Sequence, residues 1–184
     1  MLIPGIILAV GILVLLWGIG IYNSFVQSRQ NIKNGWSQID VQLKRRHDLI
    51  PNLVETAKGY LKHENTTLQE VIRARQMAVD AASLPEKQSA ENLLTSTLRS
   101  LFAVSENYPD LKANQQMIRL HEEISSTENK IAFARQYYND EVNRYNASIQ
   151  SFPDMIIARK FKFTEEKYFE IHDPQEAKTP QVKF

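Results

Sequence analysis

The chain has no cysteine among its 184 residues. Disulfides, thiolate zinc sites, iron–sulfur clusters and cysteine nucleophiles are therefore excluded. Glycine is also scarce, because only Gly35 and Gly59 lie beyond residue 20. Hairpin turns, dinucleotide-binding fingerprints and phosphate-binding loops need glycine where φ is positive or where the backbone approaches a ligand closely. This scarcity predicts a helical body that lacks such loops.

The chain also lacks an excess of charge of one sign, since 22 Lys and Arg residues stand against 21 Asp and Glu residues. Domains that bind nucleic acid carry a clear basic excess on one face, so no nucleic-acid partner is expected. Charge is absent altogether at the start of the chain, where the first charged side chain is Arg29.

The most prominent feature is the uncharged apolar stretch from Leu2 to Tyr22. As a helix it would be roughly 31 Å long, about the thickness of the hydrocarbon layer of a bilayer. Residues 1–23 are therefore predicted to be a transmembrane anchor in contact with lipid. The residues expected to lie in the membrane include Leu2, Ile7, Leu13, Leu16, Trp17 and Tyr22. A cleaved signal peptide is the alternative, although no Lys or Arg precedes the apolar core.

Basic residues on one side of the anchor predict its orientation. Arg29 and Lys33 follow the stretch, and no acidic residue occurs before Asp40. Because basic flanks stay on the cytoplasmic side, the N-terminus is expected outside and the body in the cytoplasm.

Prolines and apolar periodicity divide residues 24–158 into about four helices. The first is expected to continue the anchor, with a kink near Ile50 before Pro51, and to end between Gly59 and Asn65. The others are expected at 66–83, from Pro85 to about 107, and from Asp110 to Phe152, with Ser83 and Asp110 as N-caps. The prediction is an all-α, up-and-down antiparallel bundle continuous with the transmembrane helix. Residues 159–184 are expected to form a C-terminal segment that is disordered from 174 onward.

Two apolar stripes are the expected packing and interaction surfaces. The first helix carries Trp36, Ile39 and Leu43 at helical spacing. The last helix repeats every seven residues, as in a coiled coil. The members of this seven-residue seam are Met117, Ile124, Ile131, Tyr138, Tyr145 and Phe152.

Three arginines lie beside these stripes: Arg29, Arg75 and Arg135. A buried arginine needs a partner, and the predicted partners are Glu55, Asp80, Glu106 and Glu128. We interpret the arginines as polar layers that fix register within the bundle or between subunits. A ligand site is the alternative.

The densest charge cluster, residues 42–48, is interpreted as a polar helix face that pairs with neighbouring helices, with an anionic-lipid patch as the alternative. The four histidines stand in neither the Glu-x-x-His nor the His-Glu-x-x-His pattern and are expected to be solvated. No metal site, cofactor or catalytic residue is predicted. A hidden serine triad is the open alternative.

Several motifs resemble the LemA family. The most distinctive is WSQIDVQLKRRHDLIPNLV, from Trp36 to Val54. The others, in order, are Tyr22-Asn23 with Arg29, Gly59-Tyr60, Ala74-Arg75, Tyr108-Pro109-Asp110-Leu111-Lys112, Thr127-Glu128-Asn129, Ala134-Arg135, Tyr138-Asn139, Tyr145-Asn146 and Phe152-Pro153. The chain departs from the family at Lys162, where glycine is usual between two aromatic residues, and at Gly35, where alanine is usual.

The resemblance implies a single-pass protein of the bacterial inner membrane with a helical-bundle body. It implies no enzymatic activity and no catalytic residues. The first functional hypothesis is therefore a scaffold that forms a homo-oligomer or docks an unidentified protein along the Trp36 helix and the seam, with no small-molecule substrate. The alternatives are an enzyme or metal-binding bundle and an envelope-stress or signalling adaptor.

Overall fold

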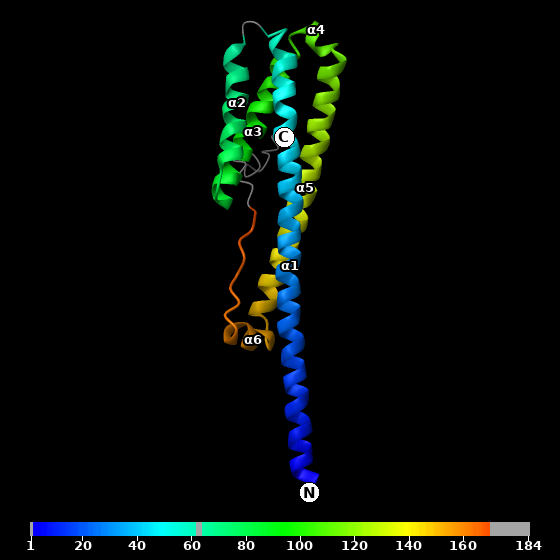
Figure 1. Ribbon diagram of the computed structural model, residues 1–184, viewed down its shortest axis with the longest axis vertical. Coiled ribbons are helices and arrows are strands. Elements are labelled where there is room, and N and C mark those ends of the chain that lie inside the picture. Colours follow the sequence, from blue (N-terminus) through cyan, green and yellow to red (C-terminus); the bar gives the residue numbers. More distant parts are fainter. Residues whose placement is uncertain (1, 62–63, 170–184) are drawn as a thin grey trace, which may run out of the picture. The chain divides into compact units, whose positions relative to one another are not determined.

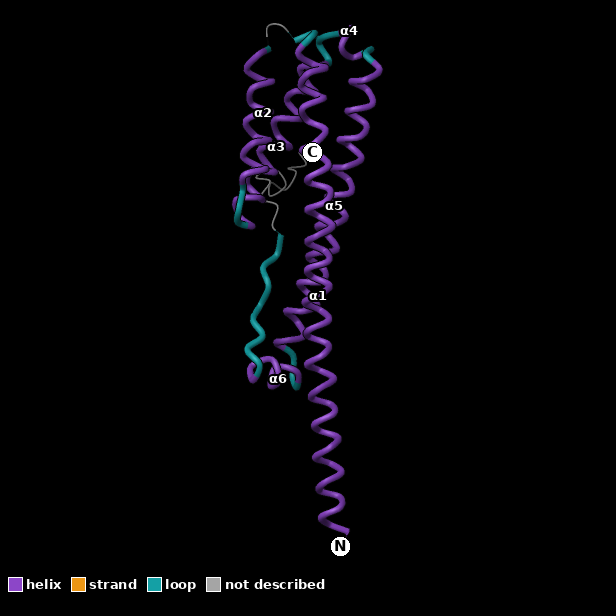
Figure 2. The backbone as a smooth tube through the Cα atoms, in the orientation of Figure 1, coloured by secondary structure: helices purple, strands orange, loops and turns teal. Residues whose placement is uncertain are grey.

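The structure is a computed structural model that describes residues 2–61 and 64–169. These residues contain six helices, labelled in Figure 1. They are α1 (Leu2–Lys58), α2 (Asn65–Asp80), α3 (Leu84–Ser105), α4 (Pro109–Lys112), α5 (Gln115–Gln150) and α6 (Asp154–Lys160). The rest of the described chain consists of loops and turns (Figure 2), so the predicted all-α class is confirmed. The disorder predicted for 174–184 lies outside the described residues.

The apolar stretch and the first helix of the body form one continuous helix, α1. Pro51 lies inside α1, which continues through the position where a kink was predicted. The helix ends at Lys58 and α2 begins at Asn65, which confirms the predicted reversal between them. In the described part of the chain, α1 is the one helix long and apolar enough to span a membrane.

The described chain divides into two compact units. Unit 1 comprises residues 2–39 and 133–168, and unit 2 comprises residues 40–61, 64–132 and Phe169. In unit 2, short connections join successive helices, and α2 and α3 lie side by side (Figure 1). Its apolar core joins side chains from all five helices that contribute to the unit. They include Ile50, Leu53, Leu68, Val71, Leu94, Leu101, Leu111 and Met117.

The start of α3 is fixed by a reciprocal cap. The Ser83 side chain accepts from the Glu86 backbone N–H, and the Glu86 carboxylate accepts from the Ser83 N–H at 3.1 Å. Hydrogen bonds from the backbones of Ser83 and Ala82 lower the pKa of Glu86. The predicted cap at Ser83 is therefore confirmed.

The predicted cap at Asp110 is wrong. Asp110 lies inside the short helix α4, and α5 begins only after Asn114. The Asn114 side-chain oxygen accepts from the backbone N–H groups of Gln116 and Met117, at 2.9 and 3.1 Å. The single turn that follows Pro109 shifts the start of the long helix by several residues.

Unit 1 is built around a non-helical strap, residues 164–168, that lies along α5. The Asn146 side chain accepts from the Glu166 N–H and donates to the Glu166 carbonyl, both at 2.9 Å. The hydroxyls of Tyr138 and Tyr145 donate to the carbonyls of Lys167 and Thr164. Burial raises the pKa of both tyrosines, so each hydroxyl keeps the proton that it donates.

The seven-residue seam is buried from Met117 to Tyr145. Phe152 does not continue it, because this residue lies beyond the end of α5 and its side chain is 80% exposed. Trp36 packs edge-on against Tyr138 in unit 1, with ring centroids 5.9 Å apart. The surfaces predicted to dock a partner are therefore largely covered by the chain itself.

Candidate functional site

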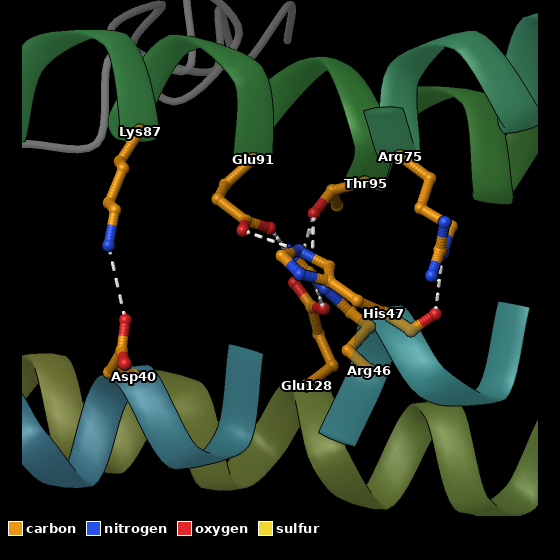
Figure 3. Close-up of polar contacts among 8 residues, drawn as sticks. All are labelled: Asp40, Arg46, His47, Arg75, Lys87, Glu91, Thr95 and Glu128. Atoms are coloured by element: carbon orange, nitrogen blue, oxygen red, sulfur yellow. Dashed lines mark hydrogen bonds and ion pairs between the residues drawn. The ribbon is translucent and has the colours of Figure 1, made fainter. Parts of the chain in front are cut away.

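The most unusual feature of unit 2 is a fully buried arginine, Arg46, in the middle of the helices (Figure 3). Its guanidinium donates to the carboxylates of Glu91 on α3 and Glu128 on α5. It also donates to the Thr95 hydroxyl at 3.0 Å. Thr95 in turn donates to Glu128 at 3.3 Å. One arginine of α1 therefore links two further helices of the unit through charged hydrogen bonds.

The next residue, His47, shares the carboxylate of Glu91. Nε2 of His47 lies 2.8 Å from Oε1 of Glu91, while the other carboxylate oxygen accepts from Arg46. Burial acts to raise the pKa of Glu91, but the hydrogen bond to His47 and the charge of Arg46 outweigh it. The net effect is a pKa below the ordinary value, so Glu91 is ionised at neutral pH.

A second arginine, Arg75, supplies a hydrogen bond to the backbone of α1 beside this cluster. Pro51 has no N–H, so the His47 carbonyl lacks the donor that a helix normally supplies four residues later. Nε of Arg75 on α2 donates to this carbonyl at 2.7 Å. Arg75 thereby allows α1 to continue through a proline.

These residues border a polar cleft of about 330 Å³ between α1, α2 and α3. The ion pair between Lys87 and Asp40, 3.1 Å long, lies to one side of the Arg46 cluster along the helices (Figure 3). The residues that line the cleft are Asp40, Leu43, Lys44, His47, Asp48, Arg75, Ala78, Val79, Lys87 and Glu91. Three carboxylates face three permanent cations and one histidine, so the cleft exerts no strong net attraction on an ion of either sign.

The chemistry open to this arrangement is narrow. A His–Glu pair is a common general base, but the other oxygen of Glu91 is already held by Arg46. Among the described residues, no three His, Cys, Asp or Glu side chains gather as a metal site would need. We therefore interpret the cluster as an electrostatic core that holds three helices in register.

Two of the three arginines beside the apolar stripes bind groups other than the predicted carboxylates. Arg29 pairs with Glu166 at 3.4 Å, and Arg75 bonds to a carbonyl. Glu128, one of the four acidic residues predicted as partners of the three arginines, pairs with Arg46 instead. Arg135 is buried on α5.

The predicted membrane residues all lie on α1. Ile7, Leu13, Leu16, Trp17 and Tyr22 are exposed along the helix, as a lipid-facing surface would be. Ile39 and Leu43 are buried, in unit 1 and unit 2 respectively.

Sequence reasoning missed the buried role of Arg46 and His47. The prediction that the histidines are solvated is wrong for His47, which is buried. His121 is exposed, and its ring stacks on that of Phe102 with centroids 4.0 Å apart. His63 and His172 lie outside the described residues. The helical spacing of the sequence does indicate that Arg46 is buried. Arg46 follows Ile39 by seven residues and Leu43 by three, which places it on the buried stripe.

Comparisons with known proteins find one matching family and two similar proteins. The model of the LemA family matches residues 35–184. The chain is 29% identical over 158 residues to a protein named LemA from Metamycoplasma hominis, covering 84% of this chain and 70% of that protein. It is 22% identical over 187 residues to the magnetosome protein MamQ of Magnetospirillum gryphiswaldense, covering 88% of this chain and 68% of that protein.

Proposed function

The chain belongs to the LemA family, and from that premise we propose that it is a membrane-anchored, non-catalytic helical scaffold that works by self-association. The proposed location is the bacterial inner membrane, with a single span, the N-terminus outside and the body in the cytoplasm.

The polar cluster of unit 2 supports a structural role. The two terminal nitrogens of Arg46 donate to Glu128 and Glu91, and the cleft beside them has balanced charge. A catalytic site would keep a reactive group free for its substrate. Here the charged groups are engaged in holding helices together.

The observation that carries self-association is exposed apolar surface on the body helices. Phe133 on α5 is 71% exposed, and Tyr137, one turn later, is also exposed. On α2, Ile72 is 50% exposed and Val79, seven residues later, lies on the same exposed face. Large exposed apolar faces mark interaction sites.

A second copy of this chain is the occupant that fits these faces. The formal net charge of +1 imposes little repulsion between copies. A shared membrane also confines copies to one plane in one orientation, which raises their effective concentration.

Light scattering of the detergent-extracted full chain during size exclusion tests this proposal. We expect the wild type to run as an oligomer, and Phe133→Glu or Ile72→Glu to shift it toward the monomer. The matched controls Gln116→Glu and Thr66→Glu add the same charge at exposed positions of the same helices, away from the two apolar faces, and should leave the mass unchanged. A wild-type monomer at micromolar concentration would contradict self-association, and a partner co-purified in its place would support docking instead.

The orientation has its own test, because the chain has no cysteine of its own. A single cysteine at the exposed residue Ala132 should react with a membrane-impermeant maleimide only after cells are lysed. Labelling in intact cells would reverse the proposed topology.

A further inference from the structure

Helix α6 lies against the end of the apolar stretch of α1, within unit 1. A methyl group at Gly18 would lie only 3.6 Å from Cδ1 of Ile157, so α6 packs directly on α1 at this glycine. Gly18 precedes Tyr22, the end of the uncharged stretch, by about 6 Å along the helix. If α1 spans a bilayer as proposed above, α6 lies where hydrocarbon gives way to headgroups.

Aromatic rings mark the same level. The ring of Tyr22 lies 4.9 Å from that of Phe161 and 5.5 Å from that of Phe163, and Phe163 also packs on Phe25. Tyrosine is enriched at the boundary between membrane and water. The turn after α6 thus adds two rings to the end of the span.

Large apolar side chains project from this element without cover from the chain. Phe152 is 80% exposed, Ile156 55% and Phe161 52%. They flank or belong to a seven-residue helix that ends in Arg159 and Lys160. Apolar side chains next to basic ones are the pattern of a helix that lies in the interface of a membrane.

A groove of about 310 Å³ opens between this element and α1. It is lined by Tyr22, Val26, Arg29, Gln30, Lys33, Phe161, Lys162 and Phe163, none of them acidic. Arg29 is engaged by Glu166. Among the described residues, neither Lys33 nor Lys162 is in an ion pair, and both line the groove.

The backbone at Lys162 is strained. Its φ is 56°, in the left-handed region that glycine adopts without penalty. Strain at a residue that is not glycine points to a use for its side chain, and here the side chain supplies a cation to the groove.

We propose that α6 and the Phe161–Phe163 turn form an interfacial element that lies in the bilayer spanned by α1 and binds an anionic phospholipid headgroup between Lys33 and Lys162. Phe152, Ile156 and Phe161 enter the acyl boundary, and the two ammonium groups bind the headgroup phosphate. This inference rests on the proposed membrane span.

The depth of spin labels in lipid vesicles tests the interfacial position of α6 separately from the membrane span of α1, with the full chain. Because the chain lacks cysteine, spin labels can be placed singly at Leu13 in the span, at Ile156 on α6 and at Gln69 on α2. We expect the Leu13 label to be deep in the hydrocarbon, the Ile156 label about 5–10 Å below the headgroups, and the Gln69 label in water.

Each other outcome has one meaning. A deep Leu13 label with an aqueous Ile156 label would overturn the interfacial element and leave the span intact. Aqueous labels at both positions would overturn the span itself.

Lipid selectivity tests the groove. The full chain in phosphatidylcholine bilayers that contain spin-labelled phosphatidylglycerol or phosphatidylcholine should prefer the anionic lipid. Each lysine near the surface contributes about a fivefold preference, so Lys162→Gly and Lys33→Gln should each lower it by roughly that factor. The control Lys130→Gln, an exposed lysine of unit 2, should not.

Lys162→Gly is the sharpest variant, because it removes the ammonium while it relieves the backbone. We expect a chain at least as stable as the wild type that has lost selectivity. Unchanged selectivity in this variant would overturn the headgroup site.

Discussion

Nε of Arg75 donates to the backbone carbonyl of His47 at 2.7 Å. The bond joins α2 to α1 at the carbonyl that Pro51 leaves without a helical donor. A proline inside a long helix and an arginine on its neighbour thus form one structural unit.

This pairing predicts coupling between Arg75 and Pro51. Arg75→Ala should lower the free energy of unfolding by about 1–3 kcal/mol, because it leaves a carbonyl without a partner. In a Pro51→Ala background the loss should be smaller, since the introduced alanine would supply the missing N–H. A double-mutant cycle by urea denaturation measures the difference, and strictly additive losses would contradict the assigned role.

The buried charge cluster predicts an asymmetry between single and double substitutions. Arg46→Met should cost about 3–5 kcal/mol, because it leaves the buried carboxylate of Glu91 without its permanent cation and with His47 alone as a partner. Adding Glu91→Met should recover much of this loss, since Glu128 is partly exposed and can be hydrated. If the double variant were less stable than Arg46→Met alone, the charge account would fail.

Glu91 also predicts a dependence on pH. Its pKa in the folded chain lies below the ordinary value of 4.5, so the unfolded chain takes up the proton first as the pH falls. The ionised group therefore stabilises the fold above about pH 4.5, and this contribution is lost as the pH falls through the lower folded-state pKa. The stability difference between the wild type and Glu91→Gln should shrink in that window, as measured by denaturation at a series of pH values.

The cap of α3 predicts a smaller, local effect. Ser83→Ala should lower stability by about 1 kcal/mol, because the Glu86 N–H loses its acceptor. Ser89→Ala, at an exposed position inside the same helix, is the matched control and should change stability by less than about 0.5 kcal/mol. Equal effects of the two substitutions would show that the cap has no role.

The long helices of this chain were largely predictable, because their starts and ends have local causes. Ser83 and Pro85 specify the start of α3 within one turn, and the reversal after Gly59 follows from the chain around it. The all-α class followed from the scarcity of glycine in the body. The predicted membrane span followed from the length of the apolar stretch. Asp110 misled because a capping side chain and a single-turn helix have the same local sequence pattern.

The polar cluster was less predictable, because it depends on which helices meet. Arg46 lies in a run of charged residues that looks solvent-facing, and its partners Glu91 and Glu128 are 45 and 82 residues away. The periodicity placed Arg46 on the buried stripe, but only the packing of three helices selects those two carboxylates. The same holds for Arg29, whose partner Glu166 lies in the strap.

The Asn146 side chain that bonds both backbone groups of Glu166 has a further consequence. An extended stretch of chain whose amide and carbonyl groups are unpaired can pair with strands of other molecules, as the edge of a sheet does. Here one amide side chain and two phenol hydroxyls already occupy several of those groups along residues 164–168. This part of the protein is thereby shielded from intermolecular β-pairing.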